Sequence, residues 1–238
     1  MSKVRLFVEH PLGAGQCVPL TGPQAHYLFS VMRLGEGDGL ALFNGHDGEW
    51  RARVAEAGKK GGALACEART APLRLPPDVW LMFAPLKKAR TDFIVEKAAE
   101  LGVRRILPVA TGFTGAERIR RDRLQAHAVE AAEQCGGTFV PEVAELAPLA
   151  AVLEAWDPAR RVMWCDEARV GMAVALDLPP GPWAVLTGPE GGFSEAERAR
   201  LAALPFVVPV SLGPRILRAD TAAVAALALW QFHCGDWR

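Results

Sequence analysis

Two glycine-bearing segments near the C-terminus have the residue types and spacing best suited to holding a small molecule. They are Thr187-Gly188-Pro189-Glu190-Gly191-Gly192-Phe193-Ser194 and Ser211-Leu212-Gly213-Pro214-Arg215-Ile216-Leu217-Arg218-Ala219-Asp220-Thr221. Glycine allows a ligand to approach the backbone closely. Each segment follows an apolar run and precedes a helical pattern, which is typical of loops at the carboxyl ends of parallel strands. Such loops face one crevice, so we expect these two to form the walls of one pocket.

The chemistry of the two segments argues against a phosphate ligand. The sequence contains neither G-x-x-x-x-G-K-[ST] nor G-x-G-x-x-G, the spacings that hold nucleoside triphosphates and dinucleotides. Glu190 would repel phosphate, whereas a nucleoside-like or cationic ligand would tolerate it. In the second segment, apolar residues could clasp an aromatic base while Arg215 and Arg218 face an anionic polymer. The alternative is that both segments are only tight turns between a strand and a helix.

The elements that must position these loops alternate between strand and helix. Apolar runs predict strands at Val79–Pro85, Arg105–Val109, Arg161–Cys165, Trp183–Leu186 and Phe206–Val210, and helical patterns occupy residues 92–101, 118–135, 195–204 and 221–232. This alternation predicts a mostly parallel sheet covered on both faces. Ser194 and Glu197 fit a capping box, and we expect Asp220 or Thr221 to cap the last helix.

The first 70 residues follow another pattern. One short helix is expected at Pro23–Arg33, among short apolar runs separated by turn signals at Arg5–Val8, Gly39–Phe43, Trp50–Val54 and Ala63–Cys66. Several short strands in so few residues predict a small barrel. A proline-rich segment at 71–77 reads as an extended linker, so we expect domains at residues 1–72 and 73–238.

Charge and cysteine content limit the function classes. The chain has 27 basic and 27 acidic residues, yet residues 71–130 hold 11 basic and 7 acidic ones, which permits a local basic face. The five cysteines are widely spaced without a C-x-x-C pair, so we expect no disulfide framework and no metal site. That usage fits a reducing cytoplasm. We also expect no signal peptide and no membrane span.

The last predicted helix has no polar face over Ala222–Trp230. A helix that is apolar all round must be buried on all sides. A partner subunit could supply the missing cover, which favours a homodimer through the C-terminal domain. The alternative is a helix inside the core of the monomer.

The two glycine segments closely resemble the signature loops of the bacterial small-subunit ribosomal RNA uracil-N3 methyltransferases, the RsmE family of the SPOUT superfamily. Near the start, Arg5-Leu6-Phe7, His26 and Val31-Met32-Arg33-Leu34 are similar to that family's PUA-like module. In the middle, Glu96–Val103 and Glu130–Cys135 are similar to family helices. The chain departs from the family where Asp220 replaces a usual Glu, where Gly137 replaces a frequent Arg, and in the uncharged segment Thr111–Thr114.

The resemblance implies an α/β fold with a C-terminal SPOUT domain, whose parallel sheet carries a trefoil knot, and a small N-terminal PUA-like β-barrel. It implies a homodimer that transfers a methyl group from S-adenosyl-L-methionine to N3 of a specific uridine of 16S ribosomal RNA in the small ribosomal subunit. S-adenosyl-L-homocysteine is the implied product. The implied cofactor-binding residues are Leu186, Thr187, Gly188, Glu190, Gly191, Gly192, Leu212, Gly213, Ile216, Leu217, Arg218, Thr221 and Ala222.

The implied reaction needs a uracil N3 that has lost its proton. Arg218 or Arg33 is expected to stabilise the resulting anion or the adjacent phosphate, and Glu190 and Asp220 are candidates for the general base. Glu190 could instead only orient its loop, and Asp220 could only cap its helix. Because N3 lies on the Watson–Crick edge, the base must be unpaired or flipped out.

Candidate RNA contacts are Arg5, His26, Arg33, Arg51, Arg53, Lys88, Arg90, Arg118 and Arg121, to which the four-arginine run adds Arg120 and Arg123. A solvated helix face is the alternative for that run. Three other functions remain open: a SPOUT methyltransferase acting on another RNA base, a non-catalytic RNA-binding protein and a nucleotide-dependent oxidoreductase.

Overall fold

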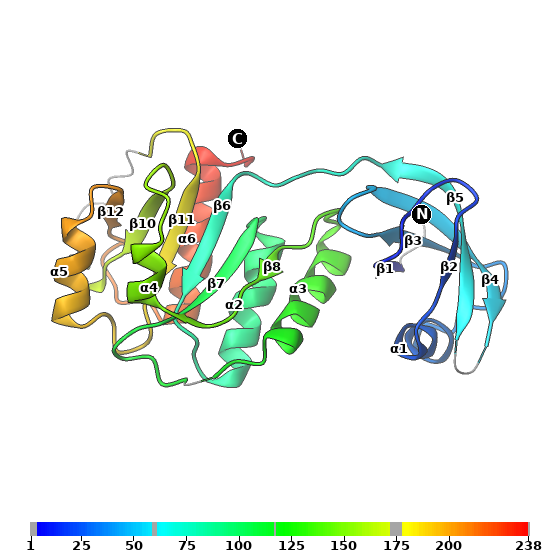
Figure 1. The fold of residues 1–238 in the computed structure, drawn as a ribbon, viewed down its shortest axis with the longest axis horizontal. Helices are drawn as coiled ribbons and strands as arrows, with labels where there is room; N and C mark the ends of the chain where they lie inside the picture. The colour runs from blue at the N-terminus through cyan, green and yellow to red at the C-terminus, as the bar shows by residue number, and fades with distance from the viewer. Residues whose placement is uncertain (1–3, 59–60, 117, 172–177, 238) are drawn as a thin grey trace. The chain divides into compact units, whose positions relative to one another are not determined.

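The computed structural model describes residues 4–58, 61–116, 118–171 and 178–237. The chain forms two compact units (Figure 1). Met1–Leu75 and Ala132–Val140 make the first unit, and Pro76–Ala131 and Pro141–Arg238 make the second. No helix among the described residues is long and apolar enough to cross a membrane.

The first unit is built on a curled five-stranded sheet. Its order is β1-β3-β4-β5-β2, and the bounds are β1 Arg5–Phe7, β2 Cys17–Pro19, β3 Gly39–Phe43, β4 Glu49–Ala57 and β5 Gly62–Ala71. Register shifts between β4 and β5 mark irregularities of the kind that bend strands. The sheet curls around fully buried Leu28, Leu40, Leu42 and Leu64, so the predicted β-rich, PUA-like module is confirmed.

The helical segment of this unit differs from the single helix predicted at Pro23–Arg33. A capping box between Thr21 and Gln24 starts α1, Gly22–Ala25, and the chain continues as the π-helix η1, His26–Val31. Arg33 has a φ of 58°, a left-handed conformation that an α-helix cannot contain. The helix therefore ends before Arg33.

The second unit contains the predicted parallel sheet. Its order is β12-β10-β11-β6-β7-β8, and β9 also pairs with β7. The bounds are β6 Val79–Phe83, β7 Arg105–Ala110, β8 Glu142–Val143, β9 Ala147–Pro148, β10 Arg161–Cys165, β11 Trp183–Thr187 and β12 Val207–Val210. All these pairs are parallel. The strands β8 and β9 were not predicted, because each has only two residues and two residues leave no periodic pattern.

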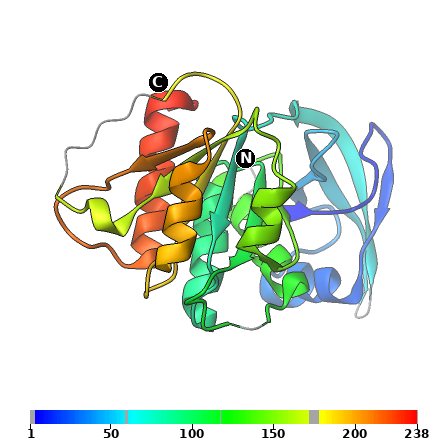
Figure 2. The ribbon, with the colours of Figure 1, turned by 60° about the vertical axis from the view of Figure 1, so that its left-hand side comes forward.

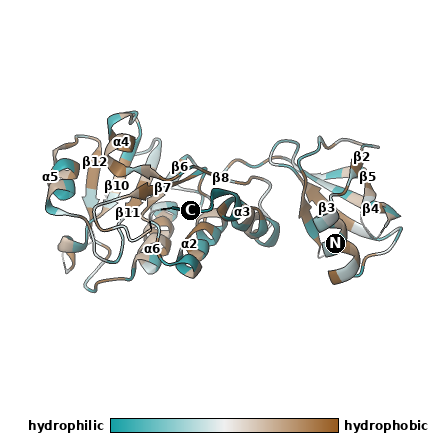
Figure 3. Cartoon of the chain, turned by 60° about the horizontal axis from the view of Figure 1, so that its bottom comes forward, coloured by the Kyte–Doolittle hydropathy of each residue, from teal (hydrophilic) through white to brown (hydrophobic). Residues whose placement is uncertain are grey.

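Helices cover both faces of this sheet (Figure 2). They are α2 Lys88–Glu100, α3 Arg121–Cys135, α4 Leu149–Glu154, α5 Glu195–Ala203 and α6 Ala219–Cys234. Met82, Trp164 and Leu186 of the strands share one core cluster with Leu149 of α4 and Leu201 of α5. On the other face α6 packs against α2 and β11. Figure 3 shows the mostly hydrophobic strands of this sheet and the more hydrophilic α3.

The strand order decides which loops meet. Because β11 lies between β10 and β6, and β12 lies beyond β10, the segment that leaves β12 must return past β10 to reach α6 beside β11. This return crossing is the connection that the predicted trefoil knot requires. Because β10 pairs in parallel with both β11 and β12, the carboxyl ends of these three strands lie at one edge of the sheet.

The start of α6 corrects one prediction. Neither Asp220 nor Thr221 caps the helix: Arg218 is the N-cap residue, and its side chain makes no capping hydrogen bond. Asp220 lies in the first turn instead, where its carboxylate accepts a hydrogen bond from the Thr221 amide at 2.9 Å. Its other carboxylate oxygen, Oδ2, lies 3.7 Å from Nε of Arg90 on α2.

The apolar α6 is only partly covered within its own unit. Ala223, Ala226, Leu227 and Trp230 are buried, since α2 and β11 pack against that side of the helix. On another side Phe232 remains 63% exposed. This exposed apolar surface of α6 could be covered by a partner subunit, as the expected homodimer requires.

Candidate active site

The two glycine loops line one cavity of about 430 Å³ at the carboxyl edge of the larger sheet. We call this cavity the crevice. The first loop contributes Thr187 to Gly192, and the second contributes Ile216 to Ala219. Ala222 of α6 and two residues after β10, Cys165 and Glu167, complete its wall. The structure therefore brings together segments that are separated by a helix and a strand in the sequence.

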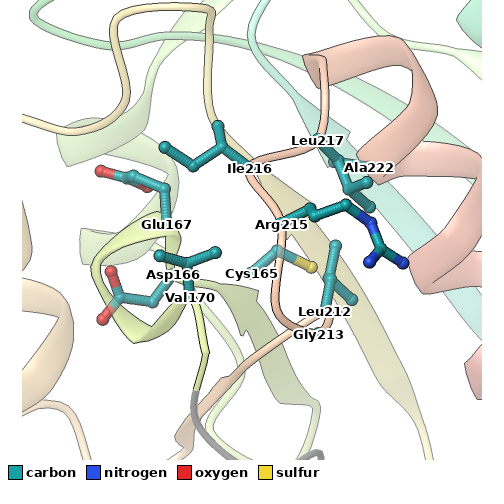
Figure 4. Close-up of a pocket in the computed structure, with 10 residues that line it drawn as sticks. All are labelled: Cys165, Asp166, Glu167, Val170, Leu212, Gly213, Arg215, Ile216, Leu217 and Ala222. Carbon is teal, nitrogen blue, oxygen red and sulfur yellow. The ribbon is translucent and has the colours of Figure 1, made fainter.

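A smaller cavity of about 60 Å³ adjoins the crevice and shares Cys165, Glu167, Ile216, Leu217 and Ala222 with it. Figure 4 shows Glu167 and Val170 facing Ile216 and Leu217, with Cys165 between the two sides. The apolar side chains of Ile216 and Leu217 thus face the Glu167 carboxylate across a narrow space. Such a space suits a ligand that has both an aromatic part and a positive charge.

The first loop needs its glycines because other groups press against the backbone. Gly192 has a φ of 69°, and a Cβ there would lie 2.4 Å from Oε1 of Glu167. The same carboxylate oxygen accepts a hydrogen bond from the Phe193 amide at 3.2 Å. A Cβ on Gly188 would lie 2.8 Å from the Phe193 ring. The loop is therefore held between a carboxylate and an aromatic ring.

The predicted capping box ends this loop. Ser194 is the N-cap residue of α5, its hydroxyl accepts from the Glu197 amide, and the Glu197 carboxylate accepts from the Ser194 amide at 2.9 Å. A second oxygen of Glu197 accepts from the Gly112 amide at 2.8 Å. This confirmed capping box fixes where the loop stops and α5 begins.

Arg90 joins the acidic residues of both loops. Its Nη1 bonds to Oε1 of Glu190, and its Nε lies 3.7 Å from Oδ2 of Asp220. Arg218 is further away, with Nη1 4.0 Å from Oε1 of Glu190. Because the Arg218 side chain is 68% exposed, its guanidinium has freedom to meet a ligand. The Arg90 guanidinium, by contrast, already pairs with Glu190 and Asp220 within the protein.

Two neighbours of the crevice have shifted pKa values. Burial raises the pKa of the Cys165 thiol to about 12, so this thiol stays protonated at neutral pH and is a poor nucleophile. Hydrogen bonding to Asp166 raises the pKa of Arg198. The Asp166 side chain is only 6% exposed, and its pairing with Arg198 anchors the segment that carries Glu167.

Most residues predicted to bind the cofactor line the crevice or the smaller cavity beside it: Thr187, Gly188, Glu190, Gly191, Gly192, Leu212, Gly213, Ile216, Leu217, Arg218 and Ala222. Leu186 does not, because its side chain belongs to the core cluster on the α4 and α5 face. Thr221 is exposed and lines neither cavity.

The residues contributed by the end of β10 were not predicted from the sequence. Cys165, Asp166, Glu167 and Val170 line one or both cavities. The available signal was the predicted strand Arg161–Cys165, since its carboxyl end must lie at the same edge as the two loops. Within the described residues, no group of three or more His, Cys, Asp or Glu side chains could hold a metal ion.

The predicted RNA contact at Arg5 is corrected by the structure. Its guanidinium donates to the carbonyls of Ala132 at 2.7 Å and Gly137 at 2.7 Å, and its Nε pairs with Glu49 at 2.8 Å. Only 14% of the side chain is exposed. Arg5 is therefore a structural residue that holds the segment 132–140 within the first unit.

The other candidate RNA contacts lie in several settings. His26 and Arg33 are exposed in the first unit, where Arg51 and Arg53 both lie near Glu67, at 2.8 Å and 3.5 Å. Arg121 donates to the Val143 carbonyl at 2.8 Å. Lys88 and Arg118 line a different cavity of the second unit, and Arg90 reaches the crevice instead.

A PUA-like sheet joined to a parallel sheet with two glycine loops at its carboxyl edge defines a SPOUT-type RNA methyltransferase. Comparison with protein families agrees: the RNA methyltransferase domain matches residues 73–231, and the RNA methyltransferase PUA domain matches residues 20–64. The chain belongs to this RNA methyltransferase family, and curated bacterial relatives of the chain are named ribosomal RNA small subunit methyltransferase E.

Relatives and solved structures match nearly the whole chain. Ribosomal RNA small subunit methyltransferase E of Rickettsia conorii is 27% identical over 240 residues, 98% of each chain. That of Synechocystis is 34% identical over 220 residues, 89% of this chain and 71% of the relative. The crystal structure of the Neisseria gonorrhoeae enzyme bound to S-adenosyl methionine has a TM-score of 0.90 and 27% identity, and the match covers 99% of both chains.

Proposed function

We propose that the protein transfers a methyl group from S-adenosyl-L-methionine to N3 of a specific uridine in 16S ribosomal RNA. The observation that carries this proposal is the meeting of the two glycine loops with Glu167 in a crevice of about 430 Å³. The Neisseria gonorrhoeae relative binds S-adenosyl methionine. The relatives are named for action on small-subunit ribosomal RNA.

The composition of the crevice supports this cofactor. S-adenosyl-L-methionine has an adenine ring and a positively charged sulfonium. Leu217 and Ile216 offer apolar contact for the ring, while Glu167 and Glu190 supply negative charge in the same crevice. The buried Cys165 thiol, with its pKa raised to about 12, supports direct transfer without a covalent cysteine intermediate.

The reaction then takes place in one displacement. The N3–H proton leaves the uracil, the N3 electron pair attacks the methyl carbon, and the carbon–sulfur bond breaks to give neutral S-adenosyl-L-homocysteine. Arg218 stabilises the uracil anion, because its exposed guanidinium stands at the wall of the crevice. Of the two candidate bases, Glu190 lines the crevice and Asp220 does not. Glu190 therefore takes the proton, and Asp220 positions Arg90.

The assembly and location belong to the same proposal. The uncovered face of α6, with Phe232 63% exposed, is the surface through which two copies pair as a homodimer. The substrate is the small ribosomal subunit, which places the reaction in the cytoplasm. Residues 1–72, together with the segment Ala132–Val140 that packs in the same unit, form the RNA-binding domain, and the rest of residues 73–238 forms the catalytic domain.

Labelled methyl transfer to ribosomal subunits that lack the modification tests the proposal. We expect label in 16S ribosomal RNA and a modified uridine whose Watson–Crick edge is blocked. Label on another base would support the methyltransferase activity but contradict uridine N3 as its target. A thermal-shift comparison of S-adenosyl-L-methionine with NAD(P) separates the other functions: a shift only with NAD(P) would indicate an oxidoreductase, and no shift with either would indicate a non-catalytic RNA-binding protein.

A further inference from the structure

The second unit holds another cavity, of about 400 Å³, between the start of α2 and the segment that leads into α3. We call it the basic cavity because Lys88, Arg118, Arg120 and Arg123 line it. None of its lining residues belongs to the crevice. Its volume is within the range of small-molecule sites and exceeds what a single inorganic ion fills.

The four cations of the basic cavity are not equivalent. Arg123 makes two hydrogen bonds to Asp92, at 2.9 Å and 2.6 Å, and Arg120 pairs with Asp122 at 3.1 Å. Lys88 and Arg118 have no carboxylate partner within 4.0 Å among the described residues. The positive charge available to a ligand therefore comes from these two side chains.

The beginning of α2 adds donors to the same cavity. Its N-cap residue Lys87 makes no side-chain capping hydrogen bond, and its first turn has no acidic residue. The first amides of a helix lack partners within the helix, and the helix dipole places partial positive charge there. The Arg90 and Thr91 amides bond to the Lys87 carbonyl at 2.9 Å and 3.2 Å, which leaves the Lys88 and Ala89 amides for a ligand. Together with the Lys88 and Arg118 side chains they form an arrangement that suits a phosphate group.

The basic cavity and the crevice flank one turn of α2. Lys88 lines the basic cavity, and Arg90, two residues later, bonds to Glu190 of the crevice. A nucleic-acid strand that places a base in the crevice would therefore bring its backbone close to the basic cavity. Pro85 and Leu86 provide apolar walls against which a sugar can pack.

We propose that the basic cavity binds a backbone phosphate of the RNA substrate, with Lys88, Arg118 and the first amides of α2 as its ligands. This proposal rests on the proposed function, because it assumes that an RNA base enters the crevice. The cavity holds the strand in place and reads no sequence. A free phosphate has the same chemistry as the backbone group, and the experiment below distinguishes the two sources.

The test compares a Lys88→Ala/Arg118→Ala variant with a Lys97→Ala/Arg200→Ala control. The control removes the same charge, but its residues pair with Glu100 and Glu154 outside the cavity. Affinity for oligouridine is measured by fluorescence anisotropy over a series of KCl concentrations. Each lost phosphate contact lowers the slope of log affinity against log salt by about 0.7 for single strands. We expect a decrease of about 0.7 to 1.4 in the cavity variant, and none in the control.

An unchanged slope in the cavity variant would overturn the proposal, even if the variant still methylates ribosomal subunits. Thermal stabilisation of the wild type by inorganic phosphate, together with an unchanged RNA slope, would assign the cavity to a free anion and also overturn it. A lower slope supports the phosphate site even if no methyl transfer to 16S ribosomal RNA is found, because binding is measured without catalysis. Titration with S-adenosyl-L-methionine should give the same affinity in both variants.

Discussion

The Nε of Arg90 on α2 lies 3.7 Å from Oδ2 of Asp220 on α6, and Nη1 of the same guanidinium bonds to Glu190. One side chain thus links two helices to the first glycine loop. The Asp220 carboxylate is only 18% exposed, so screening by solvent is reduced at this end of the pair. Arg90 therefore holds the Glu190 carboxylate in position relative to the second loop.

Replacing Arg90 with Ala should lower methyl transfer by about 100-fold, since a displacement of about 1 Å can cost this much in an aligned reaction. Steady-state kinetics with saturating S-adenosyl-L-methionine measure the effect. Arg90→Lys should recover part of the rate because it restores a positive charge. Lys97→Ala, on the same helix, should behave as wild type. Equal rates for Arg90→Ala and wild type would show that the link has no catalytic consequence.

Replacing Arg218 with Ala should reduce kcat by about 100- to 1000-fold, the usual cost of removing a group that stabilises developing negative charge. The side chain is 68% exposed and makes no capping hydrogen bond, so the free energy of unfolding should change by no more than about 0.5 kcal/mol. Arg200→Ala is the matched control, because its guanidinium pairs with Glu154 at 3.2 Å and lines neither cavity. Near-normal turnover of Arg218→Ala would show that this residue does not contribute to catalysis.

Replacing Gly192 with Ala should weaken S-adenosyl-L-methionine binding. The new Cβ would meet Glu167 at 2.4 Å, and its backbone φ of 69° is unfavourable for alanine. Gly181→Ala controls for the backbone, since its φ of 134° is also positive but a Cβ there meets nothing within 4 Å. Calorimetric titrations measure the loss of binding free energy for S-adenosyl-L-methionine in each variant. The loss in the double variant Gly192→Ala/Glu167→Ala should be smaller than the sum of the losses in the two single variants. Strict additivity would mean that the contact is unimportant.

The Cys165 thiol should resist alkylation at pH 7 to 9, because burial raises its pKa to about 12 and the thiolate is the reactive form. Cys17 and Cys135 are exposed and should react first with iodoacetamide. Peptide mass spectrometry of the native protein distinguishes the three sites. Rapid modification of Cys165 in the folded protein would contradict this assignment.

The first unit should lose stability in acid partly through Asp47. Hydrogen bonds from the Leu12 amide at 2.9 Å and from the Asn44 side chain lower the pKa of this carboxyl. A lowered folded-state pKa stabilises the protein above the unfolded value of about 3.9. That stabilisation is lost as pH falls through the lower folded-state pKa. Asp47→Asn should therefore flatten the change in unfolding free energy below about pH 4, as measured by urea denaturation at a series of pH values. An unchanged pH dependence in this variant would contradict the role of Asp47.

Local sequence patterns determined much of the architecture. The strands at Gly39–Phe43 and Arg161–Cys165 were predicted with the bounds that the structure has. The capping box at Ser194 and the pairing of the two glycine loops were also predictable. Each of these features depends on residues close together in the chain: apolar runs, turn residues and the spacing of a cap from its partner.

Tertiary structure alone decided which distant residues meet. Glu167 reaches the crevice because β10 lies beside β11 and β12, and Arg90 reaches Glu190 and Asp220 because α2 packs against α6. Arg5 is bound to backbone carbonyls 127 to 132 residues away, so its sequence neighbours could not reveal that role. Strand order and helix packing follow from burying apolar surface across the whole unit, and no local window contains that information.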